Sequence, residues 1–319
     1  MYLVRDKRVL VTGAAGFVGA NLVRALLQQG ACVHAVVRPT SDLWRLHDIQ
    51  AALTVHRADL TNFRAIQAAA TAASPHIVFH LAAPSGRPIR RAEREAYLRT
   101  CVLGTSNLLE ATADLNLHRF VHLGSSTEYG PKDHPMREQD TLHPCTFRGM
   151  TKAAATLVCQ QFARMTAQRI VVLRSFFIYG PWDSGTPLIP TVIRAVLQGS
   201  PIALTATSYR RDFVFVDDVV DACLLALDGQ PVPGELINVG SGTGWSNREV
   251  ADTVQAICDR SVDVRMGAHV SHATDTTDWI ADIQKAQTVL GWAPRHTFRQ
   301  GLEKTVAWFR ANQEQYATR

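Results

Sequence analysis

Short apolar runs alternate with longer amphipathic stretches through the first half of the chain. The runs span residues 9–11, 32–37, 53–55, 77–83, 120–123 and 170–174. Between them, apolar residues recur with helical spacing, for example over 89–115 and 149–164. Repeated alternation of strand and helix is typical of the α/β class, and it predicts a Rossmann-type, doubly wound parallel sheet.

The alternation becomes irregular after residue 180. A short strand is expected at 202–204, a strand and turn at 234–244, and helices at 191–198, 216–227, 246–258, 282–290 and 298–312. We expect a main domain over residues 1–180 and a smaller C-terminal α/β lobe over 181–319 that covers a substrate cleft. Segments such as 206–240 are expected to return to the main domain.

The first apolar run leads into three glycines spaced by two residues, Gly13, Gly16 and Gly19. Glycines at a strand–helix junction allow a tight turn and a close approach to a pyrophosphate, which then faces the N–H groups of the helix N-terminus. No Gly-Lys-Ser/Thr follows, so the motif is not a nucleoside-triphosphate loop. The glycines predict dinucleotide binding, and the alternative is an ordinary strand–helix turn.

Two later positions bear on the cofactor. The second run closes on Arg38, and no acidic residue follows before Asp42. An acidic residue there would bind the adenosine 2′-hydroxyl, whereas an Arg accommodates a 2′-phosphate, so the sequence favours NADP over NAD. Asp59 and Leu60 are suited to bracket an adenine, by hydrogen bonding and by packing. The alternatives are a solvent-facing Arg38 and an Asp59 that caps a helix.

Composition narrows the class of protein. The 319 residues are 46% hydrophobic and 19% charged, as in ordinary soluble globular proteins. The net charge of +5 suits anionic small molecules and is too diffuse to indicate nucleic acid. The six cysteines are scattered and no H-E-x-x-H motif occurs, so neither disulfides nor a metal site are expected. With no leader-like start and no apolar segment of membrane-spanning length, we expect a cytoplasmic protein without membrane contact.

Taken together, the motifs resemble those of the extended short-chain dehydrogenase/reductase family, in its nucleotide-sugar epimerase, dehydratase and 4-ketoreductase branch. The segments that carry the resemblance are 12–19, 59–60, 80–83, 124–130, Lys152, 173–181, 211–218, 238–242 and 290–294. They span nearly the whole chain, and their combination is far more specific than any one of them.

The resemblance implies a set of binding residues. A nicotinamide dinucleotide would be held by Gly13, Ala15, Gly16, Phe17, Val18, Gly19, Arg38, Asp59, Leu60, Leu81, Ala82, Ala83 and Lys152. A nucleotide-diphosphate sugar would contact Ser85, Ser125, Phe177, Leu188 and Arg211. By the same analogy, the helices over 89–115 and from 149 onward would form a homodimer interface.

The catalytic positions depart from the family pattern. Family enzymes move a proton with a Tyr four residues before the Lys, whose charge lowers the pKa of that Tyr. This sequence has Arg148 there, and it has Cys101 and Phe177 where the family places two Asn. An Arg is too basic to carry a proton, but it supplies a fixed positive charge.

We therefore expect non-standard acid–base chemistry. The expected catalytic set is Ser125, Thr127, Glu128, Arg148 and Lys152. By sequence proximity alone, the candidate proton carriers are Thr127, Glu128, Cys145 and Tyr179.

NADP(H)-dependent 4-keto reduction of a nucleotide-diphosphate sugar is the favoured activity, since residues 186–212 resemble ketoreductases of the CDP-dideoxysugar kind. The alternatives are an epimerase or dehydratase with transient cofactor oxidation, and a catalytically inactive dinucleotide-binding relative. Sugar dehydratases of the family carry an Asp-Glu or Ser-Glu pair where this sequence has Ser126 and Thr127, with Glu128 one position later, which counts against 4,6-dehydration.

Overall fold

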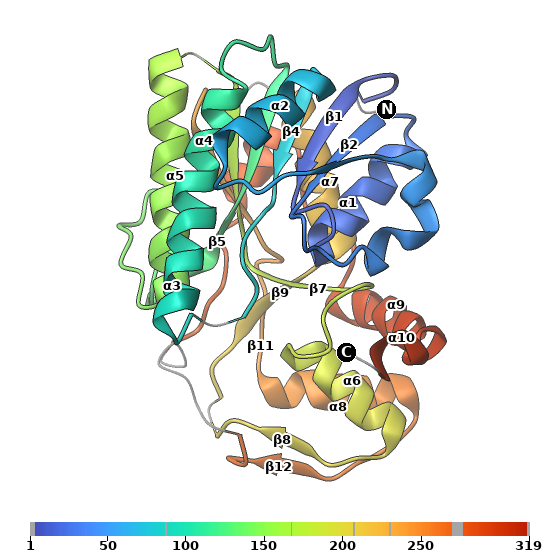
Figure 1. Cartoon of the computed structure of the whole chain (residues 1–319). Helices are drawn as coiled ribbons and strands as arrows, with labels where there is room; N and C mark the ends of the chain where they lie inside the picture. Colours follow the sequence, from blue (N-terminus) through green and yellow to red (C-terminus); the bar gives the residue numbers. More distant parts are fainter. Residues whose placement is uncertain are drawn as a thin grey trace.

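A seven-stranded sheet forms the centre of the main domain (Figure 1). The computed structural model describes residues 4–86, 88–166, 168–206, 208–229, 231–269 and 277–317. The strands are β1 (Arg8–Thr12), β2 (Cys32–Val37), β3 (Thr54–Arg57), β4 (Ile77–His80), β5 (Arg119–Ser125), β6 (Ile170–Ser175) and β10 (Glu235–Val239). Their order is β10-β6-β5-β4-β1-β2-β3, and every pairing is parallel. The predicted doubly wound α/β fold is confirmed.

Helices cover both faces of this sheet. Val9 and Val11 on β1 belong to a buried cluster with α1 (Phe17–Gln28) and α7 (Val216–Asp228). Leu10, between them, belongs to the opposite cluster, which includes residues of α2 (Phe63–Ala73), α4 (Gly104–Ala111) and α5 (Phe147–Thr166). Successive side chains of a strand point to opposite faces, so one apolar strand serves two cores.

The helix predicted over 89–115 is divided into three pieces. It consists of α3 (Arg91–Tyr97), the π-helical η2 (Leu98–Leu103) and α4, which ends at Ala111. The apolar periodicity predicted the helix but not this widened turn. The chain also contains the 3₁₀ segment η1 (Trp44–Ala52), where the sequence shows no helical periodicity.

The remaining elements build the C-terminal part below the main sheet in Figure 1. Two small sheets contain β7 (Phe177–Tyr179), β9 (Arg211–Phe215) and β11 (Gly244–Trp245), and β8 (Ile202–Leu204) with β12 (Val264–Met266). The helices are α6 (Leu188–Gln198), α8 (Asn247–Cys258), α9 (Phe298–Ala311) and α10 (Gln313–Ala317). Within the helix predicted over 282–290, the structure has the shorter π-helical segment η4 (Ala286–Leu290). None of the helices in the described ranges is long and apolar enough to cross a membrane.

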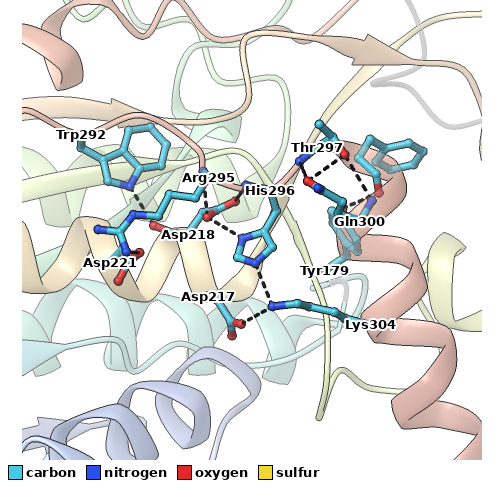
Figure 2. A network of polar contacts seen from close by, with 11 residues as sticks. Tyr179, Asp217, Asp218, Asp221, Trp292, Arg295, His296, Thr297, Gln300 and Lys304 are labelled. Carbon is cyan, nitrogen blue, oxygen red and sulfur yellow. Dashed lines mark hydrogen bonds and ion pairs between the residues drawn. The ribbon is translucent and has the colours of Figure 1, made fainter.

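A buried carboxylate anchors α9 to α7 (Figure 2). Asp218 accepts hydrogen bonds from the backbone N–H of Arg295 at 3.1 Å and from Nδ1 of His296 at 2.9 Å. Its carbonyl accepts from Nε1 of Trp292 at 2.9 Å. Because Lys304 Nζ lies 2.9 Å from His296 Nε2 and can only donate, the His296 proton resides on Nδ1. The network therefore fixes the segment before α9.

Candidate active site

The glycine loop joins β1 to α1 and lies directly against the end of β4. Gly13 has φ of 72°, and a Cβ there would lie 2.7 Å from the Ala82 nitrogen and 2.8 Å from the Leu81 carbonyl carbon. A Cβ on Gly19 would overlap the Gly13 carbonyl group. The loop therefore needs glycine at both positions, and it brings the predicted cofactor residues of β1 and β4 together.

The start of α1 is suited to an anion. Gly16 is the N-cap, so no side chain satisfies the N–H groups of the first turn, which begins Phe17-Val18-Gly19. Ala15 precedes this cap in the loop, and its carbonyl accepts a hydrogen bond from Nη1 of Arg45 at 3.5 Å. Free N–H groups and the positive end of the helix dipole favour a pyrophosphate at this position.

The adenosine side of the predicted cofactor site contains Arg38 and Asp59. Arg38 is exposed immediately after β2. Asp59 accepts a hydrogen bond from the Thr61 N–H at 2.8 Å, whereas Asn62 caps α2. The structure thus argues against the helix-cap alternative for Asp59. Leu60 is buried beside it, and Ala83 is exposed beyond β4.

Ser125 closes β5 at the carboxyl edge of the sheet. Its Oγ lies 2.9 Å from Oγ1 of Thr127, and both side chains are half-buried. In the register of the sheet, Ser125 pairs with Ser175 of β6. The two predicted hydroxyl groups are therefore adjacent, at the edge where doubly wound sheets bind ligands.

Glu128 does not suit the proton-carrying role that its sequence position suggested. Its carboxylate is fully buried and accepts from Arg174 Nε at 3.0 Å and Nη2 at 2.9 Å. It also accepts from Thr156 Oγ1 at 2.9 Å and from the Ser125 N–H at 2.8 Å. A carboxylate with an ion-pair partner and two further donors is a support for the Ser125 turn. We correct the expected catalytic set accordingly.

Tyr179 and Cys145 are also unsuited to proton transfer. Tyr179 is buried in the C-terminal core, and its hydroxyl donates to the Phe298 carbonyl at 3.1 Å. Burial raises the pKa of Tyr179, with the Asp218 charge as a smaller cause. Cys145 is exposed in the loop before α5. Neither side chain was predicted from more than sequence proximity.

Lys152 lies on α5 and points to the sheet. Its Nζ donates to the Leu123 carbonyl of β5 at 2.7 Å, and the residue is 4% exposed. Burial lowers the pKa of Lys152, and the charge of Arg148 lowers it further. Cys101 of η2 and Glu128 act in the opposite direction.

Arg148 is exposed near the start of α5, one helical turn before Lys152. Sequence reasoning missed its partner, Tyr97, at the end of α3. Tyr97 is 2% exposed, and its hydroxyl donates to the Gly86 carbonyl at 2.6 Å. Burial raises the pKa of Tyr97, while the charge of Arg148 and a hydrogen bond from it lower that pKa. Tyr97 stands four residues before Cys101, but this spacing alone does not identify its partner.

The predicted substrate residues lie in different places. Arg211 on β9 donates to the carbonyls of Arg210 at 3.0 Å and Thr277 at 2.8 Å, and its Cζ lies 5.8 Å from the Phe177 ring centroid. The structure thus brings Arg211 and Phe177 together. Leu188 begins α6 and is half-buried against the C-terminal core, while Ser85 is exposed beyond β4.

A buried chain of hydrogen bonds supports η2 from below. Thr105 Oγ1 donates to the Cys101 carbonyl, so it accepts from His80 Nε2 at 2.9 Å. His80 Nδ1 then accepts from Thr12 Oγ1 at 2.6 Å. Burial lowers the pKa of His80 to about 3, with Lys152 as a second cause, so the ring is neutral. The chain connects β1 and β4 to the position where an Asn was expected.

Known proteins resemble this chain over almost its full length. Residues 9–240 match the model of the NAD dependent epimerase/dehydratase family. The UDP-glucuronate 4-epimerase of Thermodesulfobacterium geofontis is 29% identical, covering 96% of this chain and 97% of that protein. The dTDP-glucose 4,6-dehydratase of Streptomyces niveus is 30% identical, covering 96% and 93%.

A solved structure is also similar to this chain over nearly its full length. The UDP-glucuronic acid 4-epimerase from Bacillus cereus, in complex with UDP-glucuronic acid and NAD, has a TM-score of 0.85 and 26% identity. The match covers 95% of this chain and 99% of that chain.

Proposed function

Because the chain belongs to the NAD dependent epimerase/dehydratase family, we propose that it is a 4-epimerase of a UDP-linked hexose or hexuronate. Its place in the extended short-chain dehydrogenase/reductase family makes it an enzyme of nucleotide sugars. The relatives favour the epimerase or dehydratase alternative over the net 4-keto reduction that the sequence suggested.

The environment of Glu128 is the observation that favours epimerisation over dehydration. Removing water from a sugar requires a group that protonates the leaving hydroxyl. Within residues 125–128, Glu128 contributes the only carboxylate, and it is buried in an ion pair with Arg174. Epimerisation has no such requirement, because the oxygen stays on the sugar.

The glycine loop and the start of α1 fit a nicotinamide dinucleotide. A Cβ at Gly13 or Gly19 would fill the cradle, and Gly16 leaves the helix N–H groups free of a side-chain cap. When bound, the nicotinamide would accept a hydride from sugar C4 and return it. The exposed Arg38 after β2 supports a preference for NADP, although the Bacillus cereus epimerase structure contains NAD.

Other side chains are assigned to the sugar nucleotide. Ser125 would orient the C4 oxygen with support from Thr127, because their hydroxyls adjoin at the carboxyl edge of β5. Arg211 and Phe177 would hold the nucleotide end, where the guanidinium lies against the ring. Binding at this edge follows the general rule for open α/β sheets.

An apolar stripe supports the expected homodimer. Several large apolar side chains are exposed on the adjacent η2 and α5, among them Leu98, Leu103, Met150 and Leu157. Met150 and Leu157 are seven residues apart, so they lie on one face of α5. Exposed apolar side chains on two adjacent helices are typical of an interface, and a second copy of this chain is the partner we propose.

Direct assay of the purified protein tests the proposal. UDP-glucuronic acid or UDP-glucose is incubated with NAD or NADP, and sugar products are followed by ¹H NMR. The C4 epimer should accumulate without net change in nicotinamide absorbance. Stoichiometric reduction of NAD or NADP with net oxidation of the sugar, or a 4-keto-6-deoxy product, would overturn the epimerase assignment. Lys152→Met serves as the inactive control.

A further inference from the structure

The site lacks a group that obviously moves the C4 proton. Arg148 occupies the position of the family Tyr, and a guanidinium is too basic to exchange a proton near neutral pH. Glu128 is held in a buried ion pair, and Tyr179 donates its hydroxyl proton to a carbonyl in the C-terminal core. Thr127 is an aliphatic alcohol bonded to Ser125, which does not act as a base near neutral pH, and Cys145 lies in the exposed loop before α5. Another group is therefore the better candidate for the proton transfer of the proposed epimerisation.

Lys152 has the geometry for this task. Its Nζ is anchored by one hydrogen bond, to the Leu123 carbonyl at 2.7 Å, two residues before Ser125 on the same strand. A neutral amine donates one N–H to that carbonyl and retains its lone pair as a proton acceptor. At 4% exposure, the residue lies in surroundings that disfavour a permanent charge.

Arg148 supplies a second reason for a lowered pKa of the Lys152 amine. Residues four apart on a helix lie on one face, so the two cations of α5 are neighbours. Like charges disfavour the protonated form of the more buried partner, and amines beside another cation are known nucleophiles and bases for this reason. Arg148 is exposed, whereas Lys152 is buried.

Tyr97 is the polar neighbour of Arg148. The Tyr97 hydroxyl donates to the Gly86 carbonyl at 2.6 Å, so its oxygen can accept from the Arg148 guanidinium, whose charge lowers the pKa of Tyr97. The same bond ties the segment that contains Ser85 to α3. A guanidinium that donates to this buried hydroxyl stays near Lys152, whereas an unrestrained surface Arg would extend into solvent.

We propose that Lys152 carries the proton of the sugar C4 hydroxyl, and that Arg148, held by Tyr97, is the positioning residue that makes the amine available. The inference rests on the proposed epimerase function. In the oxidative half, the C4 O–H bond breaks and an N–H bond forms on Nζ, while the C4 hydride leaves to the nicotinamide and C4=O forms. The reductive half would return the proton from Nζ to the C4 oxygen and the hydride to C4, on the opposite face of the sugar.

Several side chains of the described residues affect the protonation of Lys152. Arg148 on α5 opposes its protonation, and Cys101 on η2, Glu128 on η3 (Ser126–Glu128) and Cys159 on α5 favour it. The two histidines of the sheet beneath, His80 and His122, are kept neutral by burial, which lowers the pKa of each. Arg148 is therefore the charged neighbour whose removal should raise the pKa of Lys152.

Titration of Lys152 by NMR tests this relation without turnover. The chain has five lysines, so selective ¹³C-lysine labelling resolves them, and Lys152→Arg assigns the signal. Lys152 should titrate below the other four, and Arg148→Gln should raise its pKa. Tyr97→Phe should move it in the same direction by less, and the double variant no further than Arg148→Gln alone. Arg164→Gln, on an exposed turn of the same helix, is the control and should leave it unchanged.

The pH profile of kcat/KM then tests the catalytic role. In Arg148→Gln, the apparent pKa of the acid limb of this profile should rise by the same amount as the Lys152 pKa measured by NMR. The proposal is overturned if Lys152 titrates with the other lysines, if Arg148→Gln leaves it unmoved, or if the acid limb does not follow it. Absence of turnover in every variant overturns the epimerase function and, with it, the proton transfer, whereas the NMR shifts then decide the Arg148 coupling separately.

Discussion

The guanidinium of Arg174 and the carboxylate of Glu128 form a buried ion pair, with Nη2 2.9 Å from Oε2 and both side chains at most 1% exposed. The pair connects β6 to the turn after β5. Arg174→Met removes one partner and leaves an uncompensated charge in the core. We expect a loss of about 3–5 kcal/mol in the free energy of unfolding, measured by urea denaturation.

The double variant Glu128→Gln/Arg174→Met should recover part of this loss, because the buried charge is gone. Arg248→Ala serves as the exposed control, since its ion pair with Asp252 lies on the surface of α8. It should change stability by less than about 1 kcal/mol. Equal losses in the buried and exposed variants would contradict the role assigned to Glu128.

Gly13→Ala should weaken dinucleotide binding strongly. The added Cβ would lie 2.7 Å from the Ala82 nitrogen, in a backbone conformation with φ of 72°. Gly291→Ala is a matched control, because its φ is 62° but no atom lies within 4 Å of the new Cβ. Isothermal titration calorimetry with NADP should show an affinity at least tenfold lower for Gly13→Ala, which corresponds to a loss of roughly 1.4 kcal/mol in binding free energy. The affinity of the control should be unchanged. Similar NADP affinities in both variants would contradict the assignment of the glycine loop as the dinucleotide-binding site.

Arg38→Asp should reverse the choice of cofactor. An Asp after β2 suits the 2′-hydroxyl of NAD and repels the 2′-phosphate of NADP. We expect the ratio of NADP to NAD affinity to fall by at least about tenfold, as measured by fluorescence titration of the reduced cofactors. Arg57→Asp, two positions before Asp59 at the end of β3, is the nearby charge control. An unchanged ratio in Arg38→Asp would mean that this side chain faces solvent.

Asp183→Asn should change the pH dependence of stability. Burial raises the pKa of Asp183 to about 7, while the Ser184 N–H and the Arg45 charge act in the opposite direction. The native state thus holds a proton that the unfolded chain releases from about pH 4 upward, so stability falls as the pH rises through 7.

The amide cannot ionise, so Asp183→Asn should be the more stable protein at pH 8, by at most about 4 kcal/mol, and similar to the parent near pH 4. Thermal unfolding across this range checks the expectation. Asp114→Asn, an exposed position after α4, should show no such pH dependence. A parent whose stability does not fall between pH 5 and 8 would contradict the raised pKa.

Leu157→Glu should separate the proposed dimer. Leu157 is 55% exposed in the stripe on α5, so a charge there would be buried against a second copy. Sedimentation velocity should show a shift from dimer to monomer with intact secondary structure. Val232→Glu, at 65% exposure outside the stripe, should leave the mass unchanged. A monomeric parent protein would contradict the interface directly.

Local patterns were sufficient for the fold and for the cofactor loop. The alternation of apolar runs and helical stretches predicted the sheet, because strands covered on both faces must be apolar throughout. Gly13, Gly16 and Gly19 predicted the turn between β1 and α1, since their conformation depends on neighbours within one short segment. The π-helical η2 was not predictable in this way, because apolar spacing does not distinguish it from a regular turn.

By itself, the sequence determined most of the helices and strands, and it predicted a dinucleotide-binding loop after the first strand. Only the tertiary structure decided what the polar side chains do. Glu128 meets Arg174 from 46 residues away, which converts an apparent acid into a support. Tyr97 and Arg148 come from separate helices, and they meet through packing that no local spacing encodes. Side-chain roles depend on burial and on distant partners, and these exist only once the chain is folded.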